Sequence, residues 1–319
     1  MNLELLDHLN CYQNLLNDIS NGHLVHAYIF ISDDQEIRQA LFMKMALAIY
    51  CADNNTSCHS QIINHNHVDI RYYDADTKLK IDDIEAIIED THILPVASNH
   101  KLYFIDNADK LDKRYQNKLL KTFEEPPKYV SIVLGVNNET SLLSTIKSRG
   151  KKLYIDGLNP ADIYAELVKK GIDSDLAKLA SGYSRGNYKK ALDFASNENY
   201  KEIYEQTLLT FRTLKNSKQI IDHLYLNIFN KENISLTLDF LELFLSDILK
   251  ISTKSNLPKY TLIDDKILEE LAKEYSATSA YMAIEAINNG RAKLNSNISL
   301  ISVTEKILFD ILEAKYKWQ

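Results

Sequence analysis

Short apolar runs separated by helical segments constrain the fold of this chain most. Runs rich in β-branched and aromatic residues occur at 26–31, 68–73, 102–105 and 131–136, with a weaker one at 152–155. Segments of helical periodicity lie between them, near 35–50, 81–93, 112–125 and 139–147. Near-continuous apolar strands joined by helices are typical of a parallel sheet that is covered on both faces. The first half of the chain therefore predicts an α/β domain.

The strands stop after Gly157. Asn159 followed by Pro160 is a typical helix start, because an Asn side chain caps free N–H groups and Pro suits the first helical position. Three short helices are expected near 160–170, 173–182 and 187–196.

Helical spacing continues to the end of the chain. Apolar residues three and four apart mark one long amphipathic helix, at Leu238, Leu241, Leu245 and Ile248. A last amphipathic helix is expected between Ile298 and Leu312. We expect three domains, over residues 1–157, 158–200 and 201–319.

Composition excludes several classes of protein. The formal net charge of −7 over 319 residues does not attract DNA or an anionic membrane. The three cysteines argue against a disulfide framework and fit a reducing cytoplasm. No signal peptide is recognisable, and no apolar run reaches the ~20 residues that cross a membrane. A cytoplasmic protein is expected.

The loop after the first strand lacks the residues that bind phosphate. A P-loop reads G-x-x-x-x-G-K-[ST], in which backbone N–H groups and the Lys hold phosphates and the hydroxyl holds Mg²⁺. Here Ser32 and Ile37 stand at the glycine positions, and Arg38 and Gln39 stand at the Lys and hydroxyl positions. Three acids in this loop would also repel phosphate; they are Asp33, Asp34 and Glu36. We predict that the site does not hydrolyse ATP.

A second motif has lost its catalytic residue in the same way. The strand that begins near Lys101 ends in Asp106, where ATPases hold Mg²⁺. The next residue is Asn107, at a position where ATPases usually carry a Glu that activates water, and an amide is not a useful base. The two losses agree with each other.

These motifs resemble the clamp-loader branch of the AAA+ proteins. The segments that carry the resemblance are KLYFIDNADKL at 101–111, NKLLKTFEEPP at 117–127, SIVLGVNNE at 131–139 and LLSTIKSRG at 142–150. The resemblance is strongest over 101–150 and extends over 22–200. It implies a RecA-like AAA+ α/β domain with a degenerate P-loop, a small three-helix lid domain and an all-α C-terminal collar domain.

Within that branch, a missing P-loop implies a subunit that does not hydrolyse ATP and supplies an arginine to the ATP of its neighbour. Such an arginine finger stabilises charge on the γ-phosphate in the transition state. Arg149 is the candidate, with Ser148 positioning the loop, and Lys147, Lys151 and Lys152 make the segment locally basic. The alternative is an ordinary solvated basic turn. Gly150 stands where the family has Cys, which leaves the packing of the loop open.

The resemblance also implies a zinc module with four cysteines after the first helix. The corresponding stretch here holds only Cys51 and Cys58, followed by His59, His65 and His67. Structural zinc needs four Cys or His ligands, commonly with C-x₂₋₄-C spacing. A site formed by Cys51, Cys58, His65 and His67 is left open, and we expect no bound metal. No cofactor is expected, because ATP would be bound by partner subunits.

The leading hypothesis is a non-catalytic subunit of the clamp loader of bacterial DNA polymerase III. The resemblance implies the gamma/tau and delta subunits as partners and, through them, the sliding clamp and primer–template DNA. One alternative is a stand-alone AAA+ ATPase or helicase-like enzyme with an atypical nucleotide site. A direct DNA-binding module is another, and the lack of a basic stripe interleaved with aromatic residues argues against it.

Overall fold

The computed structural model describes residues 1–51, 56–77, 79, 81–196, 199–294 and 298–317. The chain divides into two compact units, the first formed by Met1–Asp162 with Gly186–Lys189 and the second by Ile163–Arg185 with Lys190–Gln319. The finer division at 157/158 and 200/201 stays a prediction.

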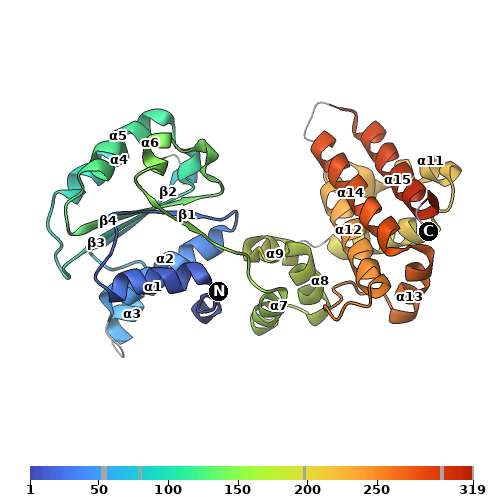
Figure 1. Ribbon diagram of the computed structural model, residues 1–319, viewed down its shortest axis with the longest axis horizontal. Coiled ribbons are helices and arrows are strands. Elements are labelled where there is room, and N and C mark those ends of the chain that lie inside the picture. The colour runs from blue at the N-terminus through green and yellow to red at the C-terminus, as the bar shows by residue number, and fades with distance from the viewer. Residues whose placement is uncertain (52–55, 78, 80, 197–198, 295–297, 318–319) are drawn as a thin grey trace. The chain divides into compact units, whose positions relative to one another are not determined.

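A parallel five-stranded sheet forms the centre of the first unit (Figure 1). Its strands are β1 (Ala27–Ile31), β2 (Ile70–Asp74), β3 (Lys101–Asp106), β4 (Val130–Val136) and β5 (Lys151–Tyr154). They lie in the order β2-β3-β4-β1-β5, and every neighbouring pair is parallel. The predicted strands and the α/β class are confirmed.

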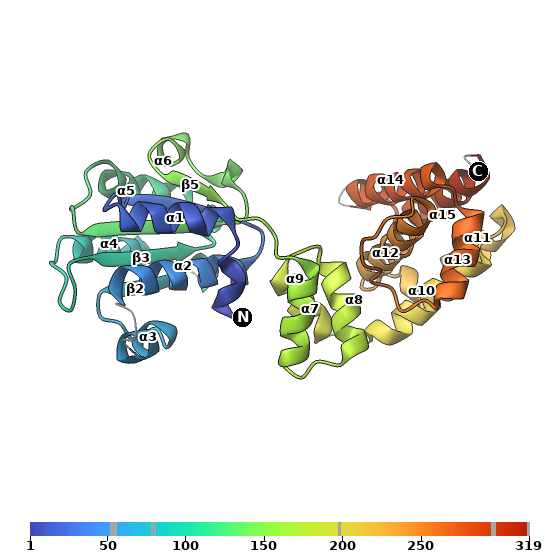
Figure 2. The same cartoon turned by 60° about the horizontal axis from the view of Figure 1, so that its bottom comes forward.

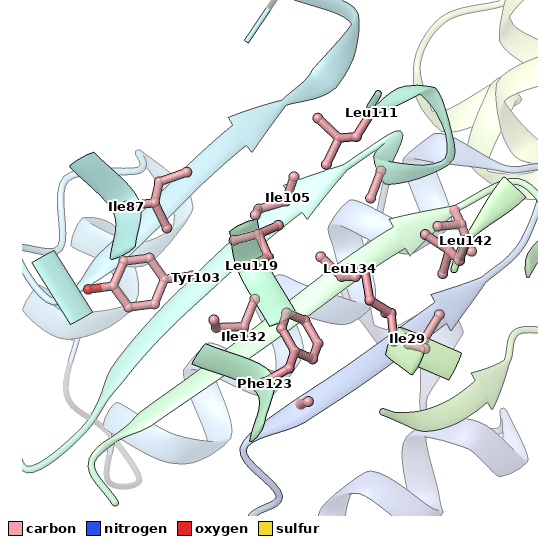
Figure 3. Close-up of a cluster of buried hydrophobic side chains, with 14 of the residues drawn as sticks. Ile29, Ile87, Tyr103, Ile105, Leu111, Leu119, Phe123, Ile132, Leu134 and Leu142 are labelled. Carbon is pink, nitrogen blue, oxygen red and sulfur yellow. The ribbon is translucent and has the colours of Figure 1, made fainter. Parts of the chain in front are cut away.

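Helices cover both faces of this sheet (Figures 1 and 2). One face carries α1 (Asn10–Ser20), α2 (Gln35–Tyr50) and α3 (Thr56–Ile63), and the other carries α4 (Ile81–Thr91), α5 (Lys113–Glu124) and α6 (Ser144–Lys147). Under α4 and α5, Leu119 and Phe123 pack on Ile105 and Ile132 of the sheet (Figure 3). Burying one such side chain contributes about 1.5–3 kcal/mol.

The helix predicted over 139–147 is interrupted. A 3₁₀ turn spans Glu139–Ser141, the backbone is extended at Leu142 and Leu143, and α6 begins at Ser144. Gln116 of α5 holds this break, because its side chain accepts a hydrogen bond from Leu143 N (2.9 Å) and donates one to Ser141 O (3.2 Å). A buried amide from another helix thus overrides the local helical pattern. Further 3₁₀ turns span Leu3–Leu6, Ala75–Thr77, Ala108–Lys110 and Asn227–Phe229.

Helices make up the second unit. They are α7 (Pro160–Lys169), α8 (Ser174–Ser184), α9 (Tyr188–Ala195), α10 (Tyr200–Thr213), α11 (Ser217–Leu224), α12 (Ile234–Ser252), α13 (Asp265–Glu274), α14 (Ala277–Leu294) and α15 (Leu300–Lys317). The first turn of α9 belongs to the first unit. The predicted stripe from Leu238 to Ile248 is buried on α12, which packs on α10, α13 and α14. Among the described residues, no helix is both long and apolar enough to span a membrane.

Candidate functional site

A buried carboxylate occupies the position where a P-loop would hold phosphate. Asp34 is the N-cap of α2, is 1% exposed, and accepts hydrogen bonds from the backbone N–H groups of Glu36 (3.1 Å) and Ile37 (3.3 Å). It also accepts from Tyr188 N and Lys189 N in the first turn of α9. Helix N-termini attract anions, so the chain's own side chain takes the donors that a phosphate would use. Burial raises the pKa of the Asp34 carboxyl, and the four N–H donors oppose that rise.

Arg38, at the P-loop Lys position, is fully buried and points into the same site. Its Nε lies 2.6 Å from Asp106 Oδ1, and its Nη2 donates to Asn107 Oδ1 at 2.9 Å. Its Nη1 donates to Ser32 O (2.5 Å) and to Asn137 Oδ1 (2.9 Å). The guanidinium therefore neutralises the carboxylate that would otherwise hold Mg²⁺.

A glycine on β4 makes room for this ion pair. A Cβ atom at Gly135 would lie 2.2 Å from Asp106 Oδ1 and 3.1 Å from Arg38 Nε. Real Cβ atoms do not approach other atoms as closely as the first distance, so only glycine fits without a shift of the pair. The site is thus filled by side chains and closed around them.

The remaining predicted site residues form the border of this network. Asn107 adopts a left-handed backbone conformation and donates from Nδ2 to Asp74 Oδ1 at 2.9 Å. Gln39 reaches Asp106 Oδ2 at 3.5 Å, and Ile37 is buried in the core. Asn107 therefore links the carboxyl ends of β2 and β3 by its hydrogen bond to Asp74.

Sequence reasoning missed Asn137 and Asp109. Asn137 follows β4, accepts from Arg38, and donates from its backbone N (3.3 Å) and from Nδ2 (3.2 Å) to the Asp109 carboxylate. The sequence signal for Asn137 was a polar residue directly after β4, the strand between β3 and β1. Ligands of parallel sheets bind at the carboxyl ends of the strands, where such a residue lies.

Arg149 lies at the opposite end of the same sheet. Arg149 lies two residues before Lys151 of β5, and Lys151 pairs with Tyr28 of β1. Asp106 lies beside Gly135 of β4, and Gly135 pairs with Phe30 of β1. By this register Arg149 and Asp106 are four residues apart along the strands, or about 13 Å. Its half-exposed guanidinium contacts Glu124 Oε1 from Nη2 (2.9 Å) and Thr145 O from Nη1 (3.0 Å). Arg149 is therefore directed away from the filled site.

The loop around Arg149 is compact. Ser148 is the C-cap of α6 and donates from Oγ to Thr145 O at 3.1 Å. A Cβ atom at position 150 would lie 2.7 Å from Ile29 Cγ1, so the Ile29 side chain occupies the space that a Cys would need. Gly150 thus fits this chain's own core.

Carboxylates from other elements pair with two lysines of the predicted basic segment. Lys151 Nζ lies 2.5 Å from Asp18 Oδ2, and Lys152 Nζ lies 2.5 Å from Glu139 Oε2. The charge of the segment was predicted from its own residues, whereas the pairing carboxylates lie on other elements. Asp18 lies in α1 and Glu139 lies in the 3₁₀ turn before α6. These ion pairs offset part of the positive charge of the segment.

The cysteine pair also differs from expectation. Cys51 and Cys58 form a disulfide, although the sequence argued against a disulfide framework. The reason is local: Cys51 is the C-cap of α2, and α3 starts at Thr56 and brings Cys58 to a Cα–Cα distance of 5.7 Å from Cys51. Cys11 is a buried free thiol, and burial raises its pKa to about 11.

The four candidate zinc ligands do not converge. His65 packs edge-on against Tyr72, and His67 Nδ1 accepts a hydrogen bond from Asp69 N (3.3 Å). Over the described ranges, which leave out 52–55, no group of three or more His, Cys, Asp or Glu side chains could hold a metal ion.

Comparisons with known proteins find relatives among the subunits of DNA polymerase III. Residues 8–159 match the family described as DNA polymerase III, delta subunit. The chain is 25% identical over 312 residues to DNA polymerase III subunit delta′ of Bacillus subtilis, covering 94% of both chains. It is 28% identical over 160 residues to subunit tau of Escherichia coli, covering 48% of this chain and 25% of that protein. A solved DNA polymerase III gamma subunit-related protein from Thermotoga maritima aligns with a TM-score of 0.44, at 18% identity over 96% of this chain and 100% of that one.

The parallel sheet, the helical second unit and the filled phosphate-loop position are the features expected of an AAA+ fold with a degenerate P-loop. The chain is homologous to the clamp-loader subunits of bacterial DNA polymerase III. One relative that matches along nearly its whole length is a delta′ subunit.

Proposed function

We propose that the chain is a non-catalytic subunit of the DNA polymerase III clamp loader, which supplies Arg149 in trans to the ATP of a neighbouring subunit. One observation carries the proposal: the carboxyl ends of the strands are filled by Asp34 and Arg38, while Arg149 is exposed at the amino ends. An arginine placed there cannot reach a phosphate at its own P-loop position, so it can act only on another subunit's nucleotide.

The chemistry of the side chain suits this role. A guanidinium is always charged and binds phosphate oxygens through two parallel N–H groups. Its partners in the free chain, one carboxylate and one carbonyl, are contacts that a phosphate can replace. Ser148 would fix the loop from which Arg149 extends, through its hydrogen bond to Thr145 O.

The partners follow from the family. They are the gamma/tau motor subunits and the delta subunit and, through them, the sliding clamp and primer–template DNA. We propose residues 158–200 as the lid domain and residues 201–319 as the collar that joins the subunits. The protein would act in the cytoplasm during DNA replication. The stand-alone ATPase is disfavoured because its phosphate site would have to displace Asp34.

The test is the DNA-stimulated ATPase of a loader reconstituted with Arg149→Ala. A missing arginine finger lowers the rate at the adjacent site by about 10³–10⁵, so the complex should lose that site's share of turnover while its assembly stays intact. Lys147→Ala, two residues away, is the matched control. An unchanged ATPase in the Arg149→Ala complex would contradict the arginine-finger role.

A further inference from the structure

Arg149 pairs with an acidic residue at the end of a helix. Glu124 is the last residue of α5, and its Oε1 lies 2.9 Å from Arg149 Nη2. The second contact of the guanidinium is the backbone oxygen of Thr145 at 3.0 Å. One anchor is therefore a fixed carbonyl, and the other is a charged side chain that can move away.

The position of Glu124 explains why it pairs with a cation. The C-terminus of a helix carries partial negative charge, which disfavours a carboxylate there. Glu125 and the prolines that follow end the helix, so a second carboxylate lies beside the first. Both acids line a shallow pocket of about 380 Å³ together with His26, Phe123 and Arg149. Arg149 supplies the positive charge that offsets the negative charge of Glu124 and Glu125 in this pocket.

The contact is weak enough to be exchanged. The Glu124 and Arg149 side chains are 45% and 36% exposed, and an ion pair in water at a protein surface favours the paired state by a factor of about five or less. A nucleoside triphosphate carries more negative charge than a carboxylate. Its γ-phosphate can also accept two N–H groups of the guanidinium at once, so it competes well with Glu124 for Arg149.

We propose that Glu124 is a positioning residue for Arg149, whose carboxylate holds the guanidinium in the free chain and is replaced by the neighbour's γ-phosphate on assembly. This inference rests on the proposed arginine-finger function. The displaced carboxylate stays near the incoming phosphate and opposes its binding. Glu124 therefore raises the ATP concentration needed at that site and leaves the chemical step, which uses the released Arg149, unchanged.

The test compares Glu124→Gln with Glu125→Gln in the reconstituted loader. Both changes remove one charge from the same pocket, but only the first removes the ion pair to Arg149. We expect Glu124→Gln to lower the KM for ATP by about two- to five-fold, the strength of an exposed pair, with kcat within two-fold of wild type. Glu125→Gln should shift KM clearly less. Equal shifts in both variants, no shift in Glu124→Gln, or a fall in its kcat would overturn the exchange.

A second measurement does not require the complex. An arginine-selective dicarbonyl reagent should modify Arg149 about two- to five-fold faster in free Glu124→Gln than in the free wild-type chain, as followed by mass spectrometry. Equal rates would overturn the proposal. Arg149→Ala separates the two hypotheses. Normal ATPase in that variant would refute the arginine-finger function itself. A loss of ATPase in Arg149→Ala, combined with wild-type behaviour of Glu124→Gln, would refute only the role of Glu124.

Discussion

Replacing Arg38 by Met should destabilise the first unit strongly. Met has a similar length and no donors, so Arg38→Met leaves the Asp106 carboxylate, 1% exposed, without its cation at 2.6 Å. Three more acceptors lose a donor in the same step: Ser32 O, Asn107 Oδ1 and Asn137 Oδ1. Removing one partner of a buried ion pair costs about 3–5 kcal/mol. That loss is a large fraction of the ~5–15 kcal/mol that stabilises a typical protein.

Urea unfolding monitored by circular dichroism measures this loss, and hydrogen exchange in peptides that cover β1 and β3 assigns it to the first unit. Asp106→Asn in the Arg38→Met background removes the unpaired charge, so the double variant should regain about 2 kcal/mol relative to Arg38→Met alone. A loss below about 1 kcal/mol in Arg38→Met, or strict additivity of the two substitutions, would show that the pair does not hold the site together.

Three further outcomes are expected. Gly135→Ala should lower the free energy of unfolding by about 1–3 kcal/mol, because its Cβ meets Asp106 Oδ1 at 2.2 Å, and a wild-type urea midpoint would contradict this. Burial lowers the pKa of His100 to about 4, so the folded chain binds fewer protons than the unfolded one, whose His titrates near 6.5. The stability that His100 contributes is present above about pH 6.5 and is lost as the pH falls toward 4; the loss between pH 7 and pH 5 should be smaller in His100→Gln, and equal losses would refute it. Leu245→Ala, fully buried in α12, should cost about 2–5 kcal/mol in urea unfolding, and a loss under 1 kcal/mol would place that residue outside the core.

The sheet could be predicted from the sequence because each strand is a local run of apolar residues that can be recognised without knowing the rest of the fold. Ala27–Ile31 and Val130–Val136 are buried along their whole length, as expected for strands covered on both faces. The helical break at Leu142 could not be predicted in this way, since the side chain that holds it comes from α5.

The phosphate site shows the same limit. The sequence identified which P-loop residues are missing, and it placed Asp34 as a charge that would repel phosphate. It did not indicate that Asp34 caps two helices, or that Arg38 pairs with Asp106, 68 residues away in the chain. Gly135 lies in β4 and Asn137 directly follows it, so their part in the network depends on the order of the strands in the sheet.

The segment that carries Arg149 was predicted from a motif, and its electrostatics were not. The partners of Arg149, Lys151 and Lys152 are Glu124, Asp18 and Glu139, which lie on three separate elements. Charges counted along a chain reveal a local field only when the fold leaves them unpaired.

The most direct test of the filled phosphate site is a titration of the purified chain with a fluorescent ATP analogue and Mg²⁺, followed by anisotropy. Asp34 occupies the N–H donors of α2, and Arg38 occupies the Asp106 carboxylate, so no saturable binding is expected up to millimolar nucleotide. Binding at one site per chain with a Kd in the micromolar range would contradict the filled site and restore the stand-alone ATPase as the better hypothesis.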